Sequence, residues 1–371
     1  MNRVARCGGA LTLALFAGCP PAGNPEPPPR QRPPEAASYP PLPARFQRGM
    51  NFDHLGGFER ALDADAATAS LTALGELGVS HVAITPSFFQ RRLGDTEFYW
   101  KRGRDAVDGD ARAAIRLAHA SGLQVLLKPH LWLEDRSDGA WRGRINPSDA
   151  AWPAWRRSYR EVLLSYARLG REERVAGMVI GSELTDLAVG RPEFWRALAA
   201  ELRPEFPGFL TYAANWDREF DRITWWDALD YVGVDAFWPL TDSPDEELTA
   251  AACAARLGAI RDALEAVSVR VGRPVLLTEV GYKSAAGAAH RPWEWHSDAT
   301  YRVDLELQAT VYDSLATVLG GAAGAEPPWL KGVYFWLWYA DLGWGGPGNT
   351  DFTPRGKPAE GVVADWYRIN R

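Results

Sequence analysis

From Arg45 onward, short apolar runs alternate with longer amphipathic stretches. The apolar runs predict strands at 46–52, 81–85, 123–128, 176–181, 209–213, 230–235, 274–279 and 332–337. Helical periodicity separates most of them, at 65–78, 105–121, 149–169, 191–203, 244–267, 298–319 and 357–369. The link between the fifth and sixth strands is shorter and less clearly helical. Strands that read as almost uninterrupted apolar runs are typical of a buried parallel sheet.

Eight strands in continuous βα alternation favour a closed (β/α)8 TIM barrel over an open doubly wound sheet. We therefore predict a single α/β catalytic domain at 45–371. Long loops follow four of the strands, at 86–104, 130–148, 280–297 and 338–356. These loops share the carboxyl-terminal face of the barrel, where barrel enzymes build their active sites.

Two glutamates mark the ends of predicted strands on that face. Glu183 follows the fourth strand and Glu279 ends the seventh, 279 − 183 = 96 residues apart. One βα unit takes roughly 30 residues, so this spacing is about three units. Either residue alone could pair with an Arg or cap the next helix. As a pair they suit a glycosidase, which needs one carboxyl as acid/base and a second as nucleophile or base.

Composition narrows the possible chemistry. The net charge of −6 argues against an extended nucleic-acid surface. The chain has 17 Trp, whose indole rings stack on the C–H faces of sugars but also fill cores. The Cys and His residues lack the spacing of a zinc site, and no Gly-rich dinucleotide fingerprint follows the first strand. We expect a monomer that uses no metal or organic cofactor and binds an oligo- or polysaccharide.

The N-terminal segment predicts export. Residues 1–18 have the Arg-flanked, short apolar stretch of a signal peptide, too short to span a bilayer. The run from Phe16 to Cys19 resembles a bacterial lipoprotein box, in which Cys19 would be lipidated; ordinary signal cleavage is the alternative. Residues 19–44 form a Pro-rich linker, with 11 Pro among the 25 residues from Pro20 to Ala44. We expect a lipid-anchored protein of the bacterial cell envelope, at the outer membrane or cell surface, or alternatively a secreted one.

The chain also resembles a known family. The resemblance is carried by the motifs GMNF (49–52), HVAITPSFFQ (81–90), LLKPHLW (126–132), WRGRINPSD (141–149), IGSEL (180–184), YAANW (212–216), DYVGVDAFWPL (230–240), LLTEVGY (276–282), GVYFWLW (332–338) and DFTPRGKPAE (351–360). Together they resemble glycoside hydrolase family 113, within the large clan of retaining (β/α)8 glycosidases, whose best-known activity is β-mannanase. The resemblance implies that Glu183 is the acid/base, that Glu279 is the nucleophile, and that β-1,4-mannan or its oligosaccharides are cleaved with retention. One alternative is a retaining β-glycosidase of the same clan that acts on another polysaccharide (glucan, galactan or an envelope glycan). Another alternative is a non-catalytic carbohydrate-binding lipoprotein.

Several side chains near the strand ends are candidates for sugar binding. Lys128 and His130 flank Pro129 after the third strand, and the family has the same Lys-Pro-His. They would bond sugar hydroxyls; the alternatives are a salt bridge at the barrel rim for Lys128 and a loop hydrogen bond for His130. Asn215 could hold a hydroxyl and Trp216 could stack on a ring, unless both simply pack in the loop after the fifth strand.

The remaining candidates are more ambiguous. Asp235 could orient a hydroxyl or a catalytic Glu, or form an ion pair at the rim. Trp336 could be the floor of the reactive subsite, with Trp141 and Trp238 as further platforms, and Tyr282 could contact the nucleophile or pack beside a helix. Most clan members have Asn before the acid/base Glu; Ser182 stands there here, which leaves the partner of the sugar 2-hydroxyl unidentified.

Overall fold

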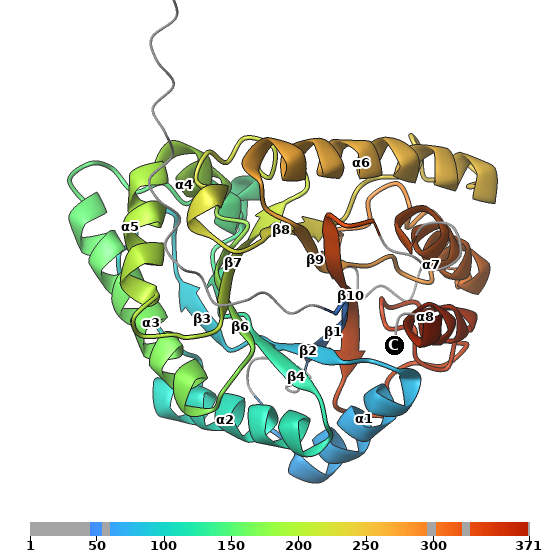
Figure 1. Cartoon of the computed structure of the whole chain (residues 1–371), viewed down its shortest axis with the longest axis horizontal. Helices are drawn as coiled ribbons and strands as arrows, with labels where there is room; N and C mark the ends of the chain where they lie inside the picture. The colour runs from blue at the N-terminus through green and yellow to red at the C-terminus, as the bar shows by residue number, and fades with distance from the viewer. Residues whose placement is uncertain (1–44, 54–59, 295–301, 321–326, 370–371) are drawn as a thin grey trace, which may run out of the picture. The chain divides into compact units, whose positions relative to one another are not determined.

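The computed structural model describes residues 45–53, 60–294, 302–320 and 327–369. Within these residues a closed barrel of eight parallel strands forms, in the order β1-β10-β9-β8-β7-β6-β4-β2 (Figure 1). The strands are β1 (Gln47–Asp53), β2 (His81–Ile84), β4 (Gln124–Leu127), β6 (Gly177–Ser182), β7 (Phe209–Asn215), β8 (Val232–Ala236), β9 (Val275–Val280) and β10 (Leu330–Tyr339). The predicted (β/α)8 barrel is therefore confirmed. The signal peptide, Cys19 and the Pro-rich linker lie outside the described residues.

Helices surround the barrel (Figure 1). They are α1 (Ala64–Leu77), α2 (Arg104–Ala120), α3 (Trp152–Glu172), α4 (Thr185–Gly190), α5 (Pro192–Leu202), α6 (Ala250–Val271), α7 (Leu305–Gly320) and α8 (Pro358–Ile369). Between β7 and β8 the structure has only a short 3-10 turn, η3 (Trp226–Ala228), as the weak helical pattern there indicates. Further 3-10 turns, η1 (Ser137–Gly139) and η2 (Arg142–Arg144), lie in the loop before α3. None of the helices in the described part of the chain is long and apolar enough to cross a membrane.

The loops after the second and third barrel strands contain structure that the sequence patterns did not predict. β3 (Ser87–Gln90) and β5 (His130–Leu133) pair in parallel as a separate two-stranded sheet, with Ser87 opposite His130. Each follows a proline, Pro86 or Pro129. Because proline interrupts the hydrogen bonding of a central strand but keeps the chain extended, each barrel strand ends there and a new short strand begins beyond it.

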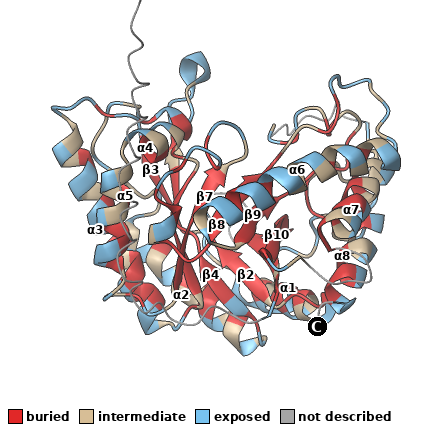
Figure 2. Cartoon of the chain, turned by 45° about the horizontal axis from the view of Figure 1, so that its top comes forward, coloured by how far each residue is buried: buried red, intermediate tan, exposed pale blue. Residues whose placement is uncertain are grey.

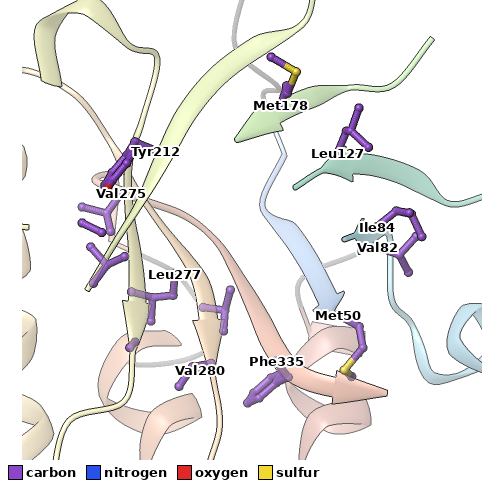
Figure 3. Packing of buried hydrophobic residues seen from close by; sticks show 14 of the residues in the cluster. Met50, Val82, Ile84, Leu127, Met178, Tyr212, Val275, Leu277, Val280 and Phe335 are labelled. Carbon is purple, nitrogen blue, oxygen red and sulfur yellow. The ribbon is translucent and has the colours of Figure 1, made fainter. Parts of the chain in front are cut away.

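Side chains alternate between the two faces of the barrel wall. Val82, Leu127, Met178 and Leu277 belong to the large core between strands and helices (Figure 3). Alternate residues of the strands form a second buried cluster that fills the interior: Ala83, Leu126, Val179, Phe209, Ala213, Tyr231, Leu276 and Tyr334. The strands are buried, whereas the outer faces of the helices are exposed (Figure 2). The alternation breaks near the ends of β6 and β9, where the register shifts, so that Glu279 contacts the interior although Leu277, two residues before it, faces the outer core.

Candidate active site

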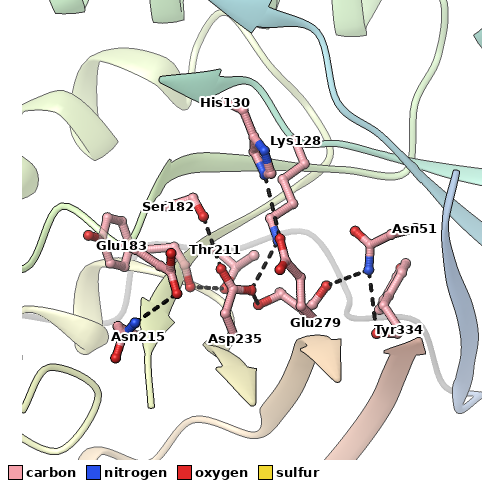
Figure 4. A network of polar contacts seen from close by, with 12 residues as sticks. Asn51, Lys128, His130, Ser182, Glu183, Thr211, Asn215, Asp235, Glu279 and Tyr334 are labelled. Carbon is pink, nitrogen blue, oxygen red and sulfur yellow. Dashed lines mark hydrogen bonds and ion pairs between the residues drawn. The ribbon is translucent and has the colours of Figure 1, made fainter. Parts of the chain in front are cut away.

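A buried polar network lies at the carboxyl ends of the barrel strands (Figure 4). The Lys128 ammonium group donates to Asp235 Oδ1 at 3.0 Å and also to Glu279 Oε1. Asp235 further accepts hydrogen bonds from Ser182 Oγ at 2.9 Å and Thr278 Oγ1 at 2.8 Å. Three barrel strands thereby bring one cation and two carboxyl groups into direct contact, in an interior where their interactions are strong.

Glu279 is almost fully buried near the end of β9. Burial raises the pKa of its carboxyl to about 8. Repulsion from Asp235 and Glu183 raises the pKa as well, whereas Lys128 and Arg142 lower it. The direct contact with the Lys128 ammonium favours the ionised carboxylate that a nucleophile requires. Neighbouring charges therefore decide whether this carboxyl is ionised near neutral pH.

Glu183 follows β6 in a backbone conformation that is unusual for a residue with a side chain. Its φ angle is +52°, in the left-handed region that non-glycine residues seldom adopt. Its carboxyl accepts a hydrogen bond from Asn215 Nδ2 at 2.8 Å on Oε1. Arg142 donates to Oε2 through Nε at 3.1 Å and through Nη2 at 2.5 Å. The carboxyl is thus held on both oxygens at the mouth of the barrel.

Arg142 is a site residue that the sequence analysis missed. It is 9% exposed, and its guanidinium lies 4.7 Å from the centre of the Trp132 ring. Burial alone would lower the pKa of Arg142, but nearby carboxylates, foremost Glu183, raise it above its ordinary value. Arg142 lies in the WRGRINPSD motif, but Arg144, two residues further on, is exposed. Residue type and spacing alone could not distinguish the buried Arg from the exposed one.

His130 and Trp336 form an aromatic wall beside Glu279. Their ring centres are 6.2 Å apart and the planes are 17° from parallel. His130 Nε2 lies 3.6 Å from Glu279 Oε1 and has no hydrogen-bond partner within the described residues. Burial, followed by the charges of Lys128 and Arg142, holds the pKa of His130 well below its ordinary value. The imidazole is therefore neutral, and its ring nitrogen is placed to meet a bound hydroxyl group.

Three other predicted binding residues also lie on the carboxyl-terminal side of the barrel. Asn215 contacts Glu183 directly, as described above. Trp216 packs against the cluster that contains Trp336, and it stacks on Trp293 with ring centres 5.3 Å apart. Trp141 precedes η2 and is 38% exposed. An exposed indole beside Arg142 is available as a surface for a sugar ring.

Lys128 and Asp235 form a buried ion pair. Both side chains are fully buried, and they pair with each other beneath the mouth of the barrel rather than at its rim. Lys128 follows the strand parity of Leu126, which belongs to the interior cluster. In the structure the Lys128 ammonium contacts Asp235 and Glu279, and its bond to a sugar hydroxyl stays a prediction.

Trp238 and Tyr282 lie on the outward side of the wall. The Tyr282 hydroxyl donates to the Trp238 carbonyl oxygen at 2.7 Å. Both side chains line a small apolar space with Leu257 and Leu264 of α6. No hydrogen bond or ion pair between described residues joins either of them to Glu183 or Glu279. Packing against α6 agrees with the second alternative for Tyr282, and the role of Trp238 as a sugar platform stays a prediction.

Within the described ranges, no group of three or more His, Cys, Asp or Glu side chains is arranged to hold a metal ion. The side chains at the mouth supply carboxyl groups, cations and aromatic rings. Two glutamates at the ends of the fourth and seventh barrel strands define a barrel of the glycoside hydrolase class, with Glu183 held by Arg142 and Asn215 and Glu279 held by Lys128.

Comparison with known proteins agrees with this class. Residues 51–357 match the model of Glycoside Hydrolase Family 113, and the chain belongs to this family. It is similar to the structure of the GH113 β-mannanase AaManA from Alicyclobacillus acidocaldarius in complex with ManMIm, with 27% identity and a TM-score of 0.72 over 88% of this chain and 98% of that one. A complex structure of a GH113 β-1,4-mannanase gives 26% identity and a TM-score of 0.72, over 87% and 99%.

A more distant likeness concerns the fold alone. A Glycoside Hydrolase Family 5 mannosidase from Rhizomucor miehei is 9% identical, with a TM-score of 0.62 over 88% of this chain and 93% of that one. The search of curated proteins found no match. The protein is thus a β-mannanase-like glycoside hydrolase with a TIM-barrel fold.

Proposed function

We propose that this protein hydrolyses β-1,4-mannan or manno-oligosaccharides with retention of anomeric configuration. The observation that carries the proposal is that Glu183 and Glu279 both lie at the mouth of the barrel (Figure 4), close enough to Arg142 that each of the two carboxylates raises the pKa of its guanidinium. The names of the two similar family structures, a β-mannanase and a β-1,4-mannanase, support the choice of substrate.

The proposed reaction has two steps. In the first, Glu279 attacks the anomeric carbon while Glu183 gives its proton to the departing glycosidic oxygen, which leaves a covalent glycosyl–enzyme. In the second, Glu183 takes a proton from water as that water attacks the same carbon, and Glu279 is released as carboxylate. Lys128 contributes by favouring the ionised form of Glu279 before the attack.

Neighbouring side chains would hold the reacting sugar. His130 offers a neutral ring nitrogen beside Glu279, and Trp336 offers the face against which that imidazole stacks. Trp216 and Trp141 extend the aromatic surface outward, where further sugar units of the chain would bind. This arrangement suits an oligosaccharide that lies across the strand ends.

The proposal is tested by measuring reducing ends released from mannan by the purified protein and by its Glu183→Ala and Glu279→Ala variants. We expect release by the native protein and loss of it in both variants. Glucan and galactan are the comparison substrates. Cleavage of either with mannan left intact would overturn the proposed substrate, and activity in the Glu279→Ala variant would overturn the assignment of the nucleophile.

We further propose that the protein is anchored in the bacterial cell envelope through lipid on Cys19. The sequence from Phe16 to Cys19 and the Pro-rich linker at 19–44 support this proposal. Stable anchoring requires more than one acyl chain, which lipoproteins carry on their first cysteine. The linker would then hold the barrel away from the membrane, within reach of a polysaccharide.

A further inference from the structure

A further carboxyl group, which takes no part in the proposed chemistry, lies behind the acid/base Glu183. Glu219 is fully buried in the link between β7 and η3. It accepts hydrogen bonds from the Tyr212 hydroxyl at 2.5 Å, the Thr185 hydroxyl at 2.9 Å and the Asn215 backbone N–H at 2.8 Å. Burial raises the pKa of Glu219 to about 8, so this carboxyl is placed where its charge is costly.

All three donors connect Glu219 to the immediate surroundings of Glu183. The Tyr212 hydroxyl accepts a hydrogen bond from the Leu184 N–H at 2.7 Å, the first peptide group after Glu183. Thr185 begins α4, two residues after Glu183. Asn215, whose backbone Glu219 holds, donates its own side-chain amide to the Glu183 carboxyl at 2.8 Å. One buried group thus fixes the chain after Glu183 and also a partner of its carboxyl.

This support is needed because of the backbone at Glu183. A φ of +52° is disfavoured for a residue with a Cβ, and it persists only where the surrounding contacts over-determine it. The Glu183 N–H is itself bonded to Ala213 O at 2.8 Å, so β7 holds the residue on one side. Tyr212 and Glu219 supply the hold on the other side through Leu184.

We propose that Glu219 and Tyr212 are positioning residues that aim the Glu183 carboxyl at the glycosidic oxygen. The inference rests on the proposed function, since it assumes that Glu183 donates the proton. Tyr159 is also buried and bonds Ile180 O of β6 at 3.0 Å, but within the described residues it bonds no carboxyl group, so it offers a comparison for Tyr212.

The test compares two aryl β-mannosides that differ in their need for an acid. Phenyl β-mannoside has a poor leaving group that must be protonated, whereas the 2,4-dinitrophenyl compound leaves unaided. The variants are Glu219→Gln, which turns one acceptor oxygen into a donor, and Tyr212→Phe, which removes the acceptor of the Leu184 N–H. We expect kcat/KM on the phenyl substrate to fall about 10- to 100-fold, the size of effect that about 1 Å of misplacement causes. On the dinitrophenyl substrate we expect a change of about twofold at most, since no proton is needed.

Tyr159→Phe is the matched control, because it also deletes a buried phenol hydroxyl bonded close to β6. It should leave the ratio of the two kcat/KM values unchanged, whatever it does to thermal stability. If Tyr212→Phe does not fold, Thr185→Val takes its place. This variant removes only the hydroxyl that donates to Glu219, and it should shift the ratio in the same direction as Glu219→Gln. Equal losses on both substrates, or an unchanged ratio in Glu219→Gln and Thr185→Val, would overturn the inference. A native protein that cleaves neither aryl mannoside nor mannan would instead overturn the proposed function, and this inference with it.

Discussion

Replacing Lys128 with Met removes one cation and little volume from the centre of the network. In the native protein the Lys128 ammonium lies between Asp235 and Glu279. It is one of the two cations that lower the pKa of Glu279, against burial and the charge of Asp235. The methionine has no charge, so Arg142 is then the one remaining cation of the two that offsets the repulsion between Asp235 and an ionised Glu279.

The size of the effect follows from the contact. An opposite charge within hydrogen-bonding distance lowers the pKa of a carboxyl by about 1–3 units, and each unit corresponds to about 1.4 kcal/mol. Loss of Lys128 should therefore raise the pKa of Glu279 further above its native value of about 8. Since only the ionised carboxylate attacks, kcat/KM below that pH should fall about 10- to 1000-fold. The acidic limb of the pH profile should move upward.

The assay is kcat/KM of Lys128→Met against pH on an aryl β-mannoside, at a temperature where circular dichroism shows the variant folded. Asp235→Asn is the control with opposite sign. It removes the Asp235 charge that repels an ionised Glu279, so the acidic limb should move to lower pH. The electrostatic account of the nucleophile would be refuted if the acidic limb moved in the same direction in both variants. It would also be refuted if the acidic limb did not move in Lys128→Met.

Two further predictions concern stability and location. Because the pKa of Glu279 is raised to about 8 in the folded protein, this carboxyl makes the native chain lose stability as pH rises from about 5 to 8. The loss should be smaller in Glu279→Gln, in which Glu219 still contributes its own share. Calorimetric unfolding at both pH values checks this; a stability difference between the two proteins that does not grow with pH would contradict it. Cys19→Ser should abolish palmitate labelling and release the protein from the membrane fraction, whereas an unlabelled native protein that fractionates in the same way as the variant would exclude the anchor.

The barrel and its two glutamates could be predicted because both depend on local patterns. Apolar runs at regular spacing specify buried parallel strands, and the end of such a run places its last residues at the mouth. Glu183 and Glu279 stand at two of these ends. The strand period of two alone would have placed Tyr282 inward with Leu276 of the interior cluster, whereas the register shift in β9 turns Val280 and Tyr282 toward the outer core.

Other parts of the site depend on long-range contacts that no local pattern encodes. Arg142 and Glu183 are 41 residues apart in sequence, and the loop that carries Arg142 is shaped by β5 and η2, which the sequence patterns did not predict. Glu219 has a polar type typical of surface loops, and only the fold reveals its burial and its three hydrogen-bond donors. The pairing of Lys128 with Asp235 likewise spans 107 residues.

The most direct test of the central claim is the anomeric configuration of the first product. Proton NMR during hydrolysis of a β-linked manno-oligosaccharide records the anomer before mutarotation mixes the two forms. Attack by Glu279, followed by water activated by Glu183, predicts that the β-anomer appears first. An initial α-anomer would mean direct attack by water and would contradict the two-step mechanism assigned to this pair of glutamates.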